Sequence, residues 1–318
     1  MKKIILPIFI LTLSLVFTVC GGDDGESDNS SHYFTVTNGD DSGPGSLRQA
    51  IADASFRGGT IDISDSVNVI ELTSRISIRF NFTINGNGVT LTRHSSWTTV
   101  GPSSQLLLVQ GANDNTSVTI NRIHFKGGKA TNEGAAILNY KDSYTSYATV
   151  LTLESCIFSE NSVTGNTYAR GGAINNKATL YVKGCTFYNN STSGTQPNTS
   201  GGGAIFNSGT LILEGNLFYI NKNGIDINTY LVLNDMGNVP VTSNGYNAVD
   251  VAPTNNGWGF HTTDKSLAAL GITSSPFNAN FVPVTELRSF ITAEPEDFPV
   301  ADFYGDLRIF PGAPGAVK

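Results

Sequence analysis

A short sequence pattern occurs four times along the middle of the chain, and it constrains the fold more than any other feature. The copies read VTINRIHF at Val118, LTLESCIF at Leu151, LYVKGCTF at Leu180 and LILEGNLF at Leu211. Their final residues are Phe125, Phe158, Phe187 and Phe218. These phenylalanines are 33, 29 and 31 residues apart. A strand-rich repeat of this length indicates a solenoid, because one coil cannot bury its apolar face alone.

Each copy predicts two short strands rather than one. In the second copy Leu151 and Leu153 share one side, Cys156 and Phe158 share it again, and the phase shifts by one residue after Glu154. Alternation with a period of two marks a strand with one buried face, and the shift indicates a turn or bulge. We therefore predict an all-β fold, a parallel β-helix with a column of stacked phenylalanines.

Asparagines occupy equivalent places in successive copies. One set follows the phenylalanines and comprises Asn161, Asn190 and Asn221; the other set comprises Asn139, Asn176 and Asn207. Because neighbouring strands lie ~4.8 Å apart, residues in register form ladders along the solenoid axis. We expect these amides to bond to one another, and we expect asparagine to supply the left-handed backbone that sharp corners need.

The repeats resemble those of a bacterial protein family. A second motif, GGAINN at Gly171 and GGAIFNSG at Gly202, precedes two of the copies, and a degraded form, GAAILNY, begins at Gly134. These motifs resemble the GGAI and FxxN repeats of polymorphic outer membrane proteins, and the opening of residues 34–51 is similar to many β-helix surface proteins. The resemblance implies a right-handed parallel β-helix on a bacterial surface.

The last residues carry a second resemblance. Residues 302–318 are similar to the end of proteins with a choice-of-anchor Q domain, in which a D-G-x-x-R segment precedes the terminus. Asp302, Gly305 and Arg308 keep part of that pattern, whereas the final GAPGAVK departs from it.

The N-terminus resembles a bacterial lipoprotein signal. Two lysines precede residues 4–19, a nearly continuous apolar run of 16 residues that is shorter than a membrane span of ~20 residues. Cys20 follows and would carry the lipid. Phe17 and Val19 depart from the residues usual before that cysteine. We expect a lipoprotein of the outer membrane or cell surface; the alternatives are ordinary cleavage with secretion, or retention as a membrane anchor.

The chain divides into four segments. We predict a signal peptide at 1–19, a flexible tether at 20–32, the β-helix with its N-terminal cap at 33–252, and a closing C-terminal cap at 253–318. Within the last segment, residues 265–270 are consistent with a short helix. The N-terminal cap is predicted as a helix, because Ser46 and Gln49 have capping-box spacing and Leu47, Ile51 and Ala54 share one face.

Composition narrows the classes of ligand. The net charge of −7 argues against nucleic acid as a ligand, because nucleic-acid binding needs a basic face. Charged residues make up only 14%, so polarity comes from Ser, Thr, Asn and Gly, which suits an extracellular glycan. We expect a monomer without a cofactor or metal, binding a carbohydrate or a host or cell-surface protein and meeting the membrane only through its anchor.

The two mature cysteines are expected to be free thiols. Cys156 and Cys185 occupy the same place in consecutive coils. Their Cα atoms would lie within reach of a disulfide, but their side chains would point in parallel, which disfavours the bond. We read both as small buried apolar residues.

Candidate functional residues are few. Tyr140, Tyr144, Tyr147 and Tyr168 cluster in sequence around a long insertion, and exposed aromatic residues suit sugar binding. Glu154, Lys183 and Glu214 occupy equivalent places, where we expect an exposed ladder of alternating charge.

Three functions fit these features. A non-enzymatic, adhesin-like surface protein is favoured, because no acid, base or metal constellation is evident. The alternative is a polysaccharide lyase or glycoside hydrolase of the β-helix class, which would need paired carboxylates or a cation site. A purely structural surface component is the third.

Overall fold

The structure, a computed structural model, describes ten stretches of the chain. They are residues 32–55, 58–111, 115–141, 147–165, 167–194, 201–223, 232–234, 241–250, 258–259 and 261–318. Cys20 and Tyr144, named above as lipidation and ligand candidates, lie outside these residues, as do the predicted signal peptide and most of the tether.

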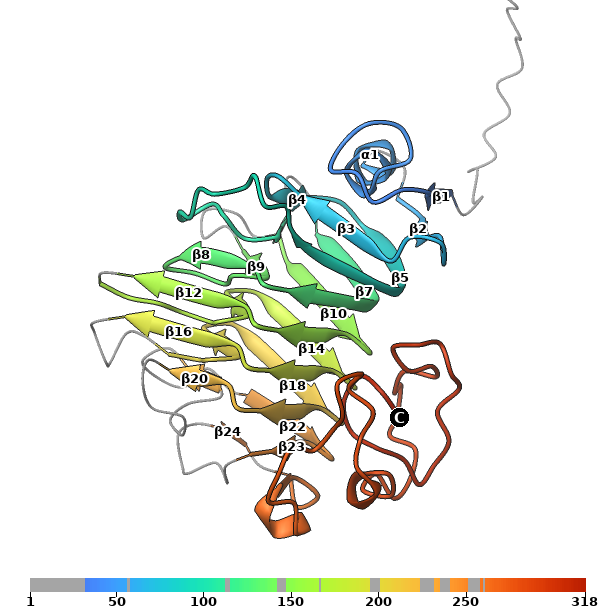
Figure 1. The fold of residues 1–318 in the computed structure, drawn as a ribbon, viewed down its shortest axis with the longest axis vertical. Helices are drawn as coiled ribbons and strands as arrows, with labels where there is room; N and C mark the ends of the chain where they lie inside the picture. The colour runs from blue at the N-terminus through green and yellow to red at the C-terminus, as the bar shows by residue number, and fades with distance from the viewer. Residues whose placement is uncertain are drawn as a thin grey trace, which may run out of the picture. The chain divides into compact units, whose positions relative to one another are not determined.

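Parallel strands wind into a β-solenoid of about six turns, which confirms the predicted fold class (Figure 1). The longest sheet begins with β1 (Tyr33–Val36), β2 (Thr60–Ile63), β3 (Val69–Leu72), β5 (Phe82–Arg93) and β7 (Thr116–Lys126). After β7 this sheet continues as two rows. The first row contains β10 (Thr149–Glu154), β14 (Thr179–Lys183), β18 (Thr210–Glu214), β22 (Val241–Gly245) and β24 (Trp258–Gly259). The second row contains β11 (Ile157–Ser159), β15 (Thr186–Tyr188), β19 (Leu217–Tyr219), β23 (Ala248–Val249) and β25 (Lys265–Ser266).

Two smaller sheets complete the coils from β7 onward, and the second of them also reaches the earlier coils. One contains β8 (Lys129–Thr131), β12 (Ser162–Gly165), β16 (Ser191–Gly194) and β20 (Lys222–Asn223). The other contains β4 (Ile76–Ile78), β6 (Leu107–Gln110), β9 (Ile137–Tyr140), β13 (Ile174–Asn176), β17 (Ile205–Asn207) and β21 (Val232–Asn234). Each repeat therefore passes once through all three sheets.

The predicted shift of phase is a bend in each coil. Strand β10 ends at Glu154, β11 begins at Ile157, and Ser155 between them has φ 49°. The equivalent residues of the next two coils are Gly184 and Gly215, with φ 58° and 60°. A left-handed residue at this place turns the chain and brings Leu153 and Phe158 to the same core despite the extra residue.

The N-terminal helix is present. Helix α1 (Leu47–Ala54) begins after Ser46, whose side chain accepts a hydrogen bond from the Gln49 amide. The Gln49 side chain bonds Asp53 instead of returning to Ser46, so only half of the predicted capping box forms. Residues on the inner face, Ile51 and Ala54 among them, join the main core.

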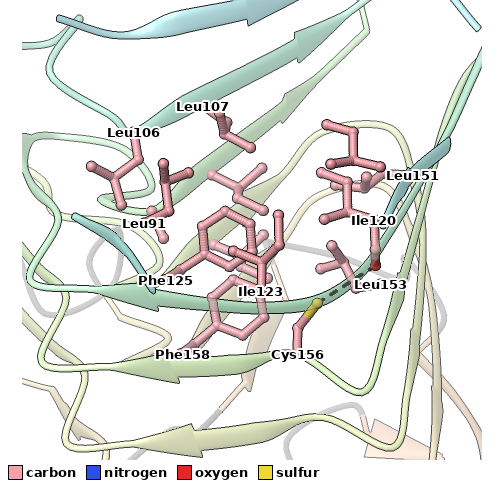
Figure 2. Packing of buried hydrophobic residues seen from close by; sticks show 14 of the residues in the cluster. Leu91, Leu106, Leu107, Ile120, Ile123, Phe125, Leu151, Leu153, Cys156 and Phe158 are labelled. Atoms are coloured by element: carbon pink, nitrogen blue, oxygen red, sulfur yellow. Dashed lines mark hydrogen bonds between the residues drawn. The ribbon is translucent and has the colours of Figure 1, made fainter. Parts of the chain in front are cut away.

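A column of phenylalanine rings forms the centre of the core. The rings of Phe125, Phe158, Phe187 and Phe218 are nearly parallel, with 4.8 Å between the centroids of each successive pair. All four side chains are fully buried. Figure 2 shows Phe125 above Phe158, with Ile123 beside them. The ring spacing equals the strand spacing because the coils are in register.

Asparagine amides bond along the axis in two buried ladders. The Nδ2 of Asn161 donates to Oδ1 of Asn190 over 2.8 Å, and Asn190 donates to Asn221 over the same distance. In the second ladder Asn139 donates to Asn176 over 2.7 Å, and Asn176 donates to Asn207 over 2.6 Å.

The expectation that these asparagines adopt the left-handed conformation is wrong. The residues with positive φ at this corner stand immediately before the ladder: Glu160, Asn189 and Ile220, with φ 58°, 53° and 46°. The ladder asparagines do not adopt this conformation, because their side-chain amides point inward. There the amide oxygens also accept hydrogen bonds from backbone N–H groups; Asn161 Oδ1, for example, accepts from Gly128 N.

A third ladder joins the two thiols to asparagines. The Cys156 amide donates to Cys185 Sγ over 3.4 Å, and the Cys185 amide donates to Asn216 Oδ1 over 2.8 Å. The backbone amide of Asn216 donates to Asn247 Oδ1, and the backbone amide of Asn247 donates to Asp264 Oδ1. Both cysteines are free and buried, as predicted. Burial raises the pKa of the Cys185 thiol well above its usual value, with a further contribution from Cys156.

Residues 272–318, called the C-terminal segment below, do not simply close the end of the solenoid as predicted. They run back along the outer side of the long sheet (red in Figure 1). Arg122 Nε donates to the Phe303 carbonyl over 3.2 Å, and the Gly315 amide donates to the Gly215 carbonyl over 2.7 Å. The segment covers outward apolar residues such as Ile157 and Leu217, which would otherwise face water.

The C-terminal region contains 3₁₀ turns in place of the predicted helix, and a buried arginine holds its end. The helix considered at 265–270 is strand β25 followed by a 3₁₀ turn, Ala268–Leu270; a second 3₁₀ turn spans Thr285–Leu287. Arg308 Nη2 donates to the Gly315 carbonyl over 2.7 Å and to the Ala316 carbonyl over 3.1 Å. Burial lowers the pKa of Arg308 to about 10. This side chain ties the end of the chain to the segment that precedes it.

Candidate functional site

The three tyrosines of this set that the structure describes, Tyr140, Tyr147 and Tyr168, do not all flank the same sheet. Tyr140 ends β9 and Tyr147 precedes β10, so both flank the connection between those strands. The Lys177 ammonium lies 5.6 Å from the Tyr140 ring centre, and Tyr147 is 39% exposed. Tyr168 follows β12 at a different corner of the coil. Closeness in sequence was a poor guide here, because a coil separates residues that flank its different sheets.

Tyr168 lines an open pocket of about 630 Å³ at the end of the four-stranded sheet. This polar pocket is lined by Thr131, Asn132, Thr164, Gly165, Thr167, Tyr168, Ser193 and Gly194. Its residues come from three successive coils, because Thr131, Thr164 and Ser193 pair across β8, β12 and β16. None of these lining residues carries an ionisable group except the Tyr168 phenol.

The local backbone holds the polar pocket in shape. Asn132, at φ 75°, donates its amide to the Thr164 carbonyl over 3.0 Å. A Cβ at Gly165 would collide with the Tyr168 carbonyl, so the strand and the following loop approach closely only because residue 165 is glycine. The Arg170 guanidinium lies 5.0 Å from the Tyr168 ring centre and fixes one face of the ring.

The charged ladder forms, but the expectation that it is exposed is wrong. Glu154 pairs with Lys183 across β10 and β14, and Lys183 pairs with Glu214 across β14 and β18. The C-terminal segment passes over this row: Lys183 Nζ donates to the Asp297 carbonyl over 2.8 Å, and Glu214 is only 4% exposed. Nothing in the repeat indicated this cover, because residues 272–318 lie outside the repeat.

Burial shifts the pKa values of both glutamates upward. It raises the pKa of Glu154, and Lys183 only partly opposes the rise. Burial raises the pKa of Glu214 in the same way, although the charge of Lys183 and a hydrogen bond from the Asn244 side chain lower it. The nearby carboxyl of Asp297 raises both pKa values further.

The two glutamates open into separate cavities. Glu214 lines an acidic pocket of about 560 Å³, formed by Tyr181, Lys183, Glu214, Ser243, Asn244, Tyr246, His261, Pro295, Glu296 and Asp297. Glu154 lines a smaller cavity of about 310 Å³, together with Arg122, Ser155 and residues 299–301. The C-terminal segment contributes residues 295–297 to the first cavity and residues 299–301 to the second. A single ligand in either cavity therefore meets one glutamate of the ladder.

A histidine lies beneath the C-terminal segment further along the long sheet. His124 Nε2 is 2.7 Å from Ser159 Oγ, and its ring meets the edges of Phe281 and Phe303 at centroid distances of 5.5 and 6.4 Å. Burial lowers the pKa of His124 to about 4, and the charge of Lys126 contributes. The imidazole is therefore neutral where the segment packs against it.

This histidine predicts a pH dependence of stability. In the unfolded chain His124 has a pKa of about 6.5, so between about pH 6.5 and 4 the unfolded state binds more protons than the folded state. The stability contributed by the neutral ring is complete above the unfolded pKa. It falls by up to about 3 kcal/mol as the pH drops through this window. Urea unfolding at pH 7 and pH 4.5 should show the loss.

Variants isolate the contribution of His124. His124→Gln should flatten the dependence between pH 7 and 4.5, while His94→Gln, which alters a histidine bonded to Ser96 in its own turn, should keep it. An unchanged pH profile in His124→Gln would show that another group is responsible.

Among the residues that the structure describes, no helix is long and apolar enough to cross a bilayer. Comparisons of the chain with protein-family models, with curated proteins and with solved structures find no match.

Proposed function

We propose that the chain is a non-enzymatic, adhesin-like protein of the bacterial cell envelope that binds a glycan in the polar pocket. The observation that carries the proposal is the composition of this pocket: hydroxyl and amide groups from three coils surround one tyrosine ring. Hydroxyl groups both donate and accept hydrogen bonds, as sugar hydroxyls do, and a tyrosine ring offers an apolar face with a polar edge. A neutral saccharide matches this chemistry better than a charged or purely apolar ligand.

The surface location rests on the sequence. The lipoprotein-like signal with Cys20 and the resemblance to polymorphic outer membrane proteins and to choice-of-anchor Q proteins support a lipid-anchored protein. A parallel β-solenoid is the fold that those resemblances imply. Secretion without an anchor is the alternative, and membrane fractionation of the native host distinguishes the two.

Replacing Tyr168 tests the binding site. Tyr168→Ala should weaken binding of the retained glycan at least tenfold, about 1.4 kcal/mol, because the ring supplies the stacking surface. Binding would be measured with the full chain on a panel of neutral and acidic polysaccharides, followed by calorimetry with the retained member.

Tyr147→Ala is the matched control, since it removes an exposed tyrosine at another corner of the coil. Equal losses in both variants, or none in Tyr168→Ala, would contradict the placement of the site.

A carbohydrate-active enzyme is the second candidate. It is favoured by the raised pKa of Glu154 and Glu214, because a protonated carboxyl can act as a general acid. The two residues are separated by two strand spacings, roughly 10 Å, near the upper end of the range for inverting hydrolases. Their opening into different cavities places this function second. New reducing ends or unsaturated products in the polysaccharide panel would reverse the order.

A further inference from the structure

The acidic pocket holds more negative than positive charge. Glu214, Glu296 and Asp297 line the pocket together with Lys183. His261 is the other ionisable nitrogen in its lining, and its Nδ1 is engaged with Thr263 at 2.7 Å. Three carboxyl groups thus share one lysine, in an open pocket between the long sheet and the C-terminal segment.

One oxygen in this pocket has no partner. Glu214 is 4% exposed, and its Oε2 is buried without a hydrogen-bond donor among the described residues. Buried carboxylate oxygens are normally paired, since an unpaired one forfeits its hydration. Burial raises the pKa of Glu214, although Lys183 and a hydrogen bond from the Asn244 side chain oppose the rise. A ligand that brings a positively charged donor into the pocket would satisfy the oxygen and reduce the excess charge.

The aromatic residues of the acidic pocket indicate the kind of cation. Tyr181 and Tyr246 line it together with the carboxylates, and a tyrosine ring attracts organic ammonium groups through its face. Tyr246 is fixed by a 2.9 Å bond from its hydroxyl to Thr292 and by edge contact with Phe290. No three His, Cys, Asp or Glu side chains of the described residues converge closely enough to hold a metal ion. The lining therefore suits an ammonium group better than a metal.

We propose that the acidic pocket binds a primary ammonium group, with Glu214 Oε2 accepting one of its hydrogen bonds. The carrier is a de-N-acetylated amino sugar, and this choice of carrier rests on the proposed glycan-binding function. The polar pocket would bind the neutral part of the glycan. The acidic pocket would give the protein a preference for amino sugars whose amine is free over those whose amine is acetylated.

Calorimetry with the full chain tests the proposal. The probes are a glucosamine hexasaccharide, its fully N-acetylated counterpart and spermidine. The wild type should bind the glucosamine oligomer at least tenfold more tightly than the acetylated one, and Glu214→Gln should remove that preference. Glu286→Gln, which removes an equal charge from an exposed position of the C-terminal segment, should change the affinity less than twofold.

A second variant tests the same pocket in case Glu214→Gln does not fold. Tyr181→Ala should weaken glucosamine binding about fivefold and leave the thermal melting of the protein cooperative. Equal binding of the two oligomers, no binding of the glucosamine oligomer, or unchanged binding in both variants would overturn the proposal. If spermidine binds more tightly than the glucosamine oligomer and Glu214→Gln removes this binding, the ammonium site is supported. The proposal that an amino sugar carries the ammonium group is then contradicted.

These experiments distinguish failure of the proposed glycan site in the polar pocket from failure of the proposed ammonium site in the acidic pocket. Tyr168→Ala tests the polar pocket alone and should leave the Glu214-dependent preference for the free amine intact. Failure of neutral glycans to bind, with this preference retained, would refute the proposed glycan function of the polar pocket and leave the ammonium site standing.

Discussion

Replacing Phe187 with alanine should lower the free energy of unfolding by about 3–5 kcal/mol, the usual cost of deleting a fully buried phenylalanine ring. Phe187 stacks on Phe158 on one side and on Phe218 on the other, at 4.8 Å each. Deletion removes both stacking contacts and leaves a cavity in the middle of the column. Backbone bonds of the neighbouring coils restrict how far the walls can collapse into it.

Urea unfolding followed by circular dichroism measures this loss. Tyr147→Ala deletes an exposed ring and should cost less than 1 kcal/mol. A Phe187→Ala protein as stable as the wild type would show that the column contributes little to the fold.

Replacing Asn190 with alanine should cost about 3–5 kcal/mol, although it removes no apolar surface. The Asn190 amide donates to the Phe158 carbonyl and to Asn221 Oδ1, and its Oδ1 accepts two bonds from Asn161. All these groups are almost fully buried, so the four bonds of the Asn190 side chain are lost without access to bulk water. Asn221 Oδ1 keeps the backbone N–H of residue 190, and Asn161 Nδ2 keeps the Phe125 carbonyl.

The adjacent Asn189 gives a matched control. Asn189 has φ 53°, and Asn189→Gly should be nearly neutral because glycine adopts this conformation without strain. Thermal unfolding of both variants separates the effect of the ladder from that of the corner. A loss in Asn190→Ala no larger than in Asn189→Gly would mean that water or a rearranged side chain replaces the missing amide.

Much of the fold could be predicted because the repeat carries its own register. Once Phe158 and Phe187 are aligned, every other equivalent pair follows, including Asn161 with Asn190 and Glu154 with Lys183. The strand alternation and the break before Ser155 are likewise local signals, and the structure shows the bend there. These predictions needed no knowledge of contacts between distant parts of the chain.

The third ladder was missed because its chemistry changes along the row. Cys156 and Cys185 read as buried apolar residues, and Asn216 and Asn247 occupy the same place in later coils. A thiol accepts an amide hydrogen bond weakly, so cysteine can continue a row of asparagines without looking like one. Aligning the copies by position rather than by residue type would have found it.

The candidate site was predicted less well than the fold. Tyr168 could be named from its type, but its separation from Tyr140 and Tyr147 depends on which sheet each residue flanks. Glu214 was expected to be exposed, because the sequence shows only its own strand and not the segment that covers it. The contact between Arg122 and Phe303 spans 181 residues, and no local pattern predicts such a pairing.

The course of the C-terminal segment has a consequence for the order in which the chain can fold. Stacked coils contact only their neighbours and can form one after another as the chain emerges from a ribosome or a translocation channel. Phe303 returns to Arg122, and Ala316 returns to Thr186, so residues near the end fasten coils made much earlier. Until that final stretch arrives, Ile157 and Leu217 present an apolar strip to water, and the half-made solenoid is open to chaperones and to proteases. We therefore expect the completed chain to join coils that would otherwise fray separately into one unit that opens cooperatively.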